Sequence, residues 1–127
     1  YALAQECMKN SPEVTAIAAI NDMVAYGVRD AILDAGMRIP EDISLCGFDN
    51  IYPSGFHGID LTTVEHSIVE RGRSSVRLLA EKLRGESELL MDANSITRVE
   101  YPSQLVIRGS TGRPPSTGRT HTETDRS

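Results

Sequence analysis

The chain has 127 residues, of which 39% are hydrophobic and 24% charged, and its formal net charge is −5. This composition is ordinary for a soluble globular protein, and no apolar run approaches the roughly 20 residues of a membrane helix. Residues 1–111 contain 10 Lys and Arg against 16 Asp and Glu. A surface with that balance repels phosphate backbones, so this part of the chain is not expected to hold DNA by itself.

The first predicted element is a helix that is already under way at the start of the sequence. Residues 1–8 place Leu3 and Cys7 four positions apart, on one helix face. The sequence begins with tyrosine rather than methionine and opens with no signal peptide. We therefore expect a piece of a longer cytoplasmic protein, with a processed start as the alternative.

A strand, a helix and a second strand are expected next. Residues 15–20 form a short apolar run of the kind that a parallel strand buried on both faces requires. Apolar residues then recur on one helical stripe, at Val24, Val28, Ile32 and Ala35. Gly36 is placed to end this helix, and Pro40 prevents its return. Residues 43–48 predict the second buried strand.

Each of these strands ends at a polar residue, Asn21 after the first and Asp49 after the second. Ligands of open parallel sheets bind beyond the carboxyl ends of the strands, so Asn21 and Asp49 are expected side by side on a crevice rim. A carboxylate and an amide suit a ligand with many hydroxyl groups. The structural alternatives are that Asp49 caps a turn and Asn21 caps the helix. Asp22 is expected to interact with the dipole of the helix in its first turn.

The loop 51–60 carries three aromatic rings, those of Tyr52, Phe56 and His57. Tyr52 and Phe56 would stack on the apolar face of a sugar ring, or they would simply anchor the loop. The histidines have no metal-ligand spacing, so neither a metal nor a cofactor is expected. Because no nucleophile elbow, P-loop or dinucleotide motif occurs, we do not expect an enzyme.

The second half of the chain predicts a connector, a helix and an extended end. Residues 61–64 are extended, and Ser67 with Glu70 has the spacing of a capping box. The following helix has Ile68, Val76, Leu79 and Leu83 on one face and ends at Gly85. Residues 86–95 are polar and irregular, and residues 96–107 predict an extended pair or an edge strand broken by Pro102. Residues 112–127 lack large apolar side chains and predict a disordered tail.

Four motifs in a fixed order carry a family resemblance. They read AINDMVAYG, AGMRIPEDISLCGFDN, LTTVEHS and QLVIRGST, and they extend over residues 1–111. Together they resemble the C-terminal part of the effector-binding domain of LacI-type bacterial transcriptional regulators. That domain is similar in fold to periplasmic sugar-binding proteins. The resemblance therefore implies an α/β, periplasmic-binding-protein-like (type I) parallel-sheet lobe that is present as an incomplete fragment.

The same resemblance implies a division into two lobes. Residues up to about 60 would complete the second lobe, the helix 67–84 would belong to the first, and the final strand would return to the second. Asp49 would bond effector hydroxyls. The helix after Asn21, with Met23 and Tyr26 near its start, would form part of the interface of a homodimer.

The implied function is the sensing of a small effector, a sugar or a nucleobase-like molecule, whose binding closes the lobes. Closure would change operator binding through an N-terminal helix-turn-helix that this chain lacks, with no membrane partner. The alternative is an extracytoplasmic sugar-binding protein that delivers its ligand to a transporter. A third possibility is that the isolated fragment has no activity.

Overall fold

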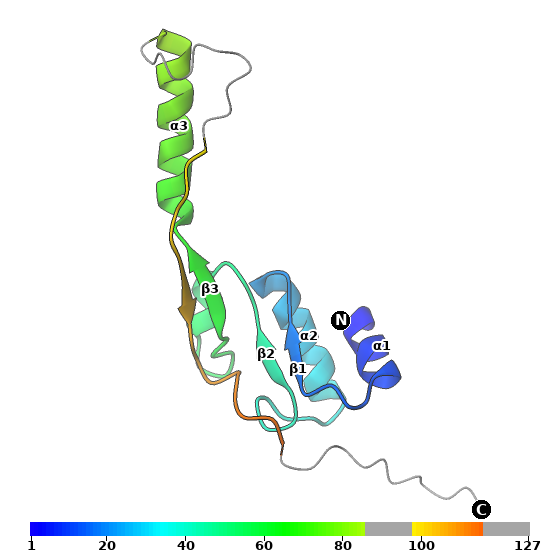
Figure 1. Cartoon of the computed structure of the whole chain (residues 1–127). Helices are drawn as coiled ribbons and strands as arrows, with labels where there is room; N and C mark the ends of the chain where they lie inside the picture. The colour runs from blue at the N-terminus through cyan, green and yellow to red at the C-terminus, as the bar shows by residue number, and fades with distance from the viewer. Residues whose placement is uncertain (86–97, 116–127) are drawn as a thin grey trace, which may run out of the picture. The chain divides into compact units, whose positions relative to one another are not determined.

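The computed structural model describes residues 1–85 and 98–115 of the chain (Figure 1). Its elements are α1 (Ala2–Asn10), β1 (Ala16–Ala18), α2 (Asp22–Asp34), β2 (Ser44–Cys46), the 3-10 helix η1 (Tyr52–Gly55), β3 (Thr63–His66), α3 (Ile68–Arg84) and β4 (Ser103–Val106). The expected order of helices and strands is therefore confirmed. The predicted irregular segment 86–95 and most of the predicted tail, 116–127, lie outside the described residues.

The chain divides into two compact units. One unit consists of Tyr1–Glu65 and the segment from Leu105 onward, and the other of His66–Gln104. The chain thus leaves the first unit near residue 65 and returns near residue 105. Both crossing points lie close to the positions at which the resemblance implies that the chain passes between two lobes.

The first unit is built on a parallel pair of strands. β1 and β2 pair in register through Ala16 with Ser44, Ile17 with Leu45 and Ala18 with Cys46. The helices α1 and α2 pack against each other, and α2 also packs against β2 (Figure 1). Their buried apolar side chains form one core, made of Ala4, Met8, Ala25, Val28, Ala31, Ile32, Ile43, Leu45 and Leu61.

The buried stripe of α2 differs from the predicted one. Val28 and Ile32 are buried as expected, but Val24 is 45% exposed and Ala35 is exposed. Ala25 and Ala31 are fully buried instead. The face that meets β2 therefore contains small residues, and these allow the helix to approach the sheet closely. Gly36 follows the helix with a φ of 71°, which confirms its predicted place at the helix end.

The strand β1 is shorter and more exposed than the apolar run predicts. Only Ala16–Ala18 are extended, with Ala16 and Ala18 exposed and Ile17 partly buried against the core. Ile20, beyond the strand, is 81% exposed. Burial on both faces was therefore wrong for this chain. Among the described residues β1 pairs with β2 alone, and α1 and α2 supply the helical packing of the unit.

The strands β3 and β4 form a second two-stranded sheet, and β4 begins directly after Pro102. The predicted capping box before α3 is wrong. Ser67 makes no side-chain cap bond, and its φ of −36° and ψ of 63° lie outside the extended region that a capping residue normally adopts. Glu70 instead accepts a hydrogen bond from Arg73 at 2.8 Å. Gly85 ends the helix with a φ of 68°, as expected.

The predicted apolar face of α3 is exposed in the described part of its unit. Val76 is 70% exposed and Leu83 is 79% exposed, and no residue of α3 is buried. Both cysteines are free, Cys7 on the surface and Cys46 partly buried. Within residues 1–85 and 98–115, none of the helices combines the length and the apolar character needed to span a membrane.

Candidate functional site

Asn21 connects the end of β1 to the start of α2. Its side-chain Oδ1 accepts a hydrogen bond of 2.8 Å from the backbone N–H of Val24, and its own backbone is extended at a φ of −156°. This is N-cap geometry, so the structural role considered from the sequence is confirmed. The bond uses one acceptor position of the amide, and a ligand role remains compatible with it.

Asp49 follows β2 in an unusual backbone conformation. Its φ is 110°, and the next residue, Asn50, has a φ of 47°. Its backbone N–H donates to the carbonyl oxygen of Val64 at 2.9 Å, which ties it to β3. Residues that are not glycine rarely adopt positive φ, and such positions cost on the order of 1–3 kcal/mol and cluster at binding sites. The backbone conformation of Asp49 thus supports the ligand-binding role predicted for this residue.

The structure brings Asn21 and Asp49 to neighbouring strand ends. The residues beside them, Asp22 and Phe48, share a backbone hydrogen bond of 2.8 Å. This bond continues the pairing of β1 with β2 beyond the strands themselves. Asn21 and Asp49 therefore both follow the carboxyl ends of adjoining parallel strands.

A polar group that sequence reasoning missed lies next to Asp49. Arg108 donates through Nη2 to Asn50 Oδ1 at 2.7 Å and through Nη1 to the carbonyl oxygen of Leu61 at 2.7 Å. The amide nitrogen of Asn50 then donates to Glu65 Oε2 at 3.2 Å. Arg108 is 58 positions from Asn50 in the sequence, and no local pattern signals that contact. The group adds both signs of charge to this edge.

The aromatic rings of the loop project outward. Tyr52 is 86% exposed and Phe56 is 45% exposed, and their ring centroids lie 5.0 Å apart at an interplanar angle of 85°. His57 is also exposed. Ser54, which lies between Tyr52 and Phe56 in the sequence, is fully buried and holds the loop instead. Because Tyr52 is so exposed, it does not anchor the loop, and its ring is accessible to a ligand.

The two residues expected at a dimer interface differ in their surroundings. Met23 is 66% exposed, whereas Tyr26 is half-buried and packs against the core. The phenol oxygen of Tyr26 lies 2.8 Å from Ser54 Oγ, within hydrogen-bond distance. Met23 is therefore the more accessible of the two, and Tyr26 also has a role inside the fold.

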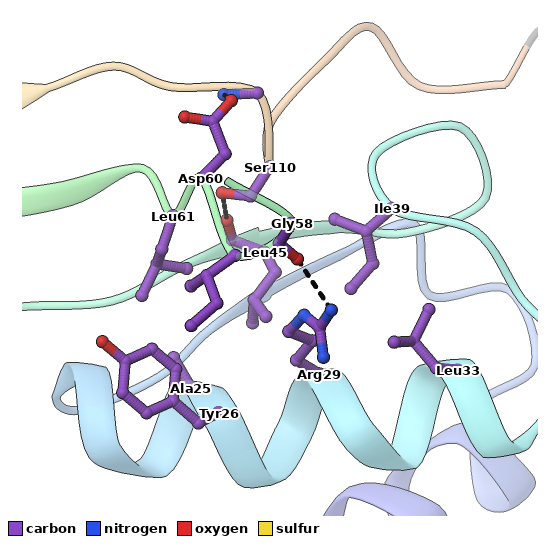
Figure 2. A pocket seen from close by; sticks show the side chains of 12 residues that line it. Ala25, Tyr26, Arg29, Leu33, Ile39, Leu45, Gly58, Asp60, Leu61 and Ser110 are labelled. Atoms are coloured by element: carbon purple, nitrogen blue, oxygen red, sulfur yellow. Dashed lines mark hydrogen bonds between the residues drawn. The ribbon is translucent and has the colours of Figure 1, made fainter. Parts of the chain in front are cut away.

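A separate cavity of about 240 Å³ lies along α2, and neither Asn21 nor Asp49 lines it (Figure 2). Its walls are formed by Tyr26, Arg29 and Leu33 of α2, by residues 58–61 and by Ser110. Arg29 donates through Nη2 to the carbonyl oxygen of Gly58 at 2.7 Å, which joins α2 to the segment 58–61 (Figure 2). The predicted crevice rim and this cavity are thus different parts of the same unit.

Comparison with known proteins identifies the fold. Residues 1–111 match the family described as a periplasmic binding protein-like domain. The chain belongs to this family. The α/β fold expected from the sequence is therefore confirmed, as is the likeness to the effector-binding domain of LacI-type regulators.

Three proteins illustrate the likeness. The HTH-type transcriptional repressor PurR of Pasteurella multocida is 40% identical over 96 residues, which cover 76% of this chain and 27% of that protein. A LacI family transcriptional regulator from Arthrobacter sp. FB24, in complex with lactose, is 33% identical with a TM-score of 0.71, covering 86% of this chain and 39% of that chain. The lac repressor dimer bound to operator and the anti-inducer ONPF is 28% identical with a TM-score of 0.70, covering 87% of this chain and 36% of that chain.

The chain therefore spans less than a third of the length of the curated repressor that it matches, 27% for the Pasteurella protein. The named relatives are regulators of transcription rather than enzymes.

Proposed function

We propose that this chain is part of the effector-sensing domain of a LacI-type transcriptional regulator, and that its effector is a small sugar. The observation that carries the proposal is the backbone hydrogen bond between Asp22 and Phe48, which holds Asn21 and Asp49 at adjoining strand ends. Parallel sheets of this type bind ligands at that end. The exposed rings of Tyr52 and Phe56 follow Asp49 in the chain.

The chemistry of these groups fits a carbohydrate. The Asp49 carboxylate accepts hydrogen bonds from two hydroxyl groups, and the Asn21 amide donates or accepts one. An aromatic ring packs against the apolar face of a sugar while the polar groups orient it. The Arthrobacter regulator in complex with lactose supports a sugar effector.

In the complete protein, effector binding closes the two lobes of the domain and shifts the protein between two states that differ in DNA affinity. The chain passes from one compact unit to the other near residues 65 and 105, so these segments act as crossovers in that movement. A cytoplasmic homodimer uses α2, including Met23 and Tyr26, and a separate basic module contacts the operator.

The test uses the complete regulator that contains this segment. Calorimetric titration with neutral sugars, including lactose, and with nucleobases such as adenine identifies the ligand class. Fluorescence anisotropy with the promoter DNA of its own gene then measures DNA affinity with and without that ligand. We expect one sugar to bind and to change DNA affinity several-fold. Binding of a nucleobase alone would reject the sugar, and an unchanged DNA affinity would reject the regulatory role.

A further inference from the structure

Asp22 occupies an unexpected place for the first residue of a helix. Sequence reasoning assigns it to the first turn of α2 as a partner of the helix dipole, where side chains are usually solvated. In the structure its side chain is fully buried. Oδ2 accepts hydrogen bonds from Ser54 Oγ at 2.5 Å and from the backbone N–H of Ile51 at 3.0 Å, and Oδ1 accepts one from Thr63 Oγ1 at 2.6 Å. A carboxylate is rarely buried unless its oxygens are satisfied in this way.

The three donors belong to the segments that surround the candidate effector site. Ile51 comes directly after Asp49 and Asn50. Ser54 lies between Tyr52 and Phe56, so its bond fixes the loop that carries both rings. Thr63 begins β3. Its Oγ1 also accepts the backbone N–H of Asn50 at 3.3 Å. One buried carboxylate thus holds both sides of the turn that begins at Asp49.

The network continues to the surface of α2. Since the Ser54 hydroxyl proton is directed to Asp22, Ser54 Oγ accepts the hydrogen bond from the phenol of Tyr26 at 2.8 Å. The space for this carboxylate depends on Gly47, because a Cβ at that position would overlap Asp22 Oδ1.

A carboxylate satisfies all three donors, because each of its oxygens accepts from at least one of them. An amide of the same shape would turn its NH2 group towards one of these donors. Even if that donor is the Thr63 hydroxyl, which can accept a hydrogen bond, the hydroxyl proton loses its acceptor. Such a replacement leaves a buried donor unsatisfied, and the surrounding segment shifts to relieve it.

We propose that Asp22 is a positioning residue of the effector site, acting through Ile51, Ser54 and Thr63 to hold the Asp49 turn and the aromatic loop in their binding conformation. The proposal rests on the proposed function. Asp22 thereby affects ligand affinity without contacting the ligand.

The experiment compares variants of the complete regulator. Asp22→Asn replaces one of the two acceptor oxygens by an NH2 group with little change in volume, and Ser54→Ala removes a single donor as a milder change. Asp30→Asn, an exposed aspartate on the same helix, is the matched control. Calorimetry with lactose measures binding, and hydrogen exchange measures the protection of backbone amides in 50–56 relative to those of α1 and α2.

We expect Asp22→Asn to bind lactose at least about tenfold more weakly and to exchange faster at 50–56 alone, with Ser54→Ala intermediate and Asp30→Asn unchanged. A purely structural role would instead lower the melting temperature and raise exchange throughout the unit. Unchanged affinity and local exchange in both Asp22→Asn and Ser54→Ala would overturn the proposal. If the unmodified protein binds no lactose, that part of the proposed function fails, and the exchange data still decide whether Asp22 positions the loop.

Discussion

The backbone N–H of Asp22 donates a hydrogen bond of 2.8 Å to the carbonyl oxygen of Phe48. This bond joins the residue after Asn21 to the residue before Asp49, so the two predicted ligand groups share one backbone connection. Their relative position is therefore set by main-chain pairing, which is less variable than contacts between side chains.

Replacing Asp49 with alanine in the complete regulator should abolish most effector binding while the fold survives. Hydrogen bonds to a charged group contribute about 1.5–3 kcal/mol each, so losing the carboxylate should weaken binding tenfold or more. Calorimetry with the effector measures this loss. Asp30→Ala, which removes an exposed carboxylate elsewhere on the unit, should bind normally. Equal affinities for the Asp49 variant and the unmodified protein would remove Asp49 from the site.

Replacing Met23 with aspartate should shift the complete regulator from dimer towards monomer in sedimentation velocity experiments. Met23 is 66% exposed at the start of α2, and a charge there would be desolvated against an apolar partner surface.

Tyr26→Phe provides the contrasting case on the same helix. It keeps the ring but loses the hydrogen bond to Ser54, so it should remain dimeric and lose about 1 kcal/mol of unfolding free energy. A Met23→Asp variant that stays fully dimeric would place the interface elsewhere.

Replacing Gly47 with alanine should destabilise the protein by about 1–3 kcal/mol, as is typical when a methyl group is forced into a packed interior. The added Cβ would overlap the Asp22 carboxylate and lie 3.0 Å from Leu61 Cδ2. Gly55→Ala is a suitable control, because its Cβ would meet the Arg108 guanidinium at an ordinary 3.7 Å. Denaturation by urea, followed by circular dichroism, compares the two. Equal midpoints would show that the space around Gly47 relaxes without cost.

The 127-residue chain alone should neither bind DNA with sequence selectivity nor bind a sugar at full affinity. Residues 1–111 carry 10 basic and 16 acidic side chains, and only three arginines follow them. The exposed apolar residues of α3 should instead favour self-association. Fluorescence titration at physiological salt tests this expectation. Nanomolar, selective DNA binding by the fragment would contradict it, as well as the assignment of DNA binding to another module.

Features encoded by local patterns could be predicted from the sequence. The apolar runs, the helical stripe and the glycines at 36 and 85 indicated the order of elements, and the strand ends indicated Asn21 and Asp49. Contacts between distant segments could not be predicted. Asp22 is buried because Ser54 and Thr63 come to it from other segments, and neither spacing nor composition signals that meeting. Arg108 reaches Asn50 for the same reason.

Some predictions from local sequence patterns were wrong because tertiary contacts outweighed the local preference. The spacing of Ser67 and Glu70 matches a capping box, but the backbone at Ser67 and the pairing of Glu70 with Arg73 exclude it. The apolar run 15–20 predicts burial on both faces, and that burial requires neighbours that the described residues do not provide. A local sequence pattern thus indicates which structures a segment can form, and its tertiary contacts determine which of them it adopts.

The close approach of Gly47 to Asp22 constrains the order in which this lineage accumulates substitutions. While the aspartate is present, a side chain at 47 is penalised, because it meets the carboxylate. Loss of the aspartate removes part of that penalty, so substitutions at 47 that were harmful become tolerable. Once such a substitution is fixed, the return of the aspartate becomes unfavourable. The pair should therefore show sign epistasis in a double-mutant cycle, and homologues should change at the two positions together.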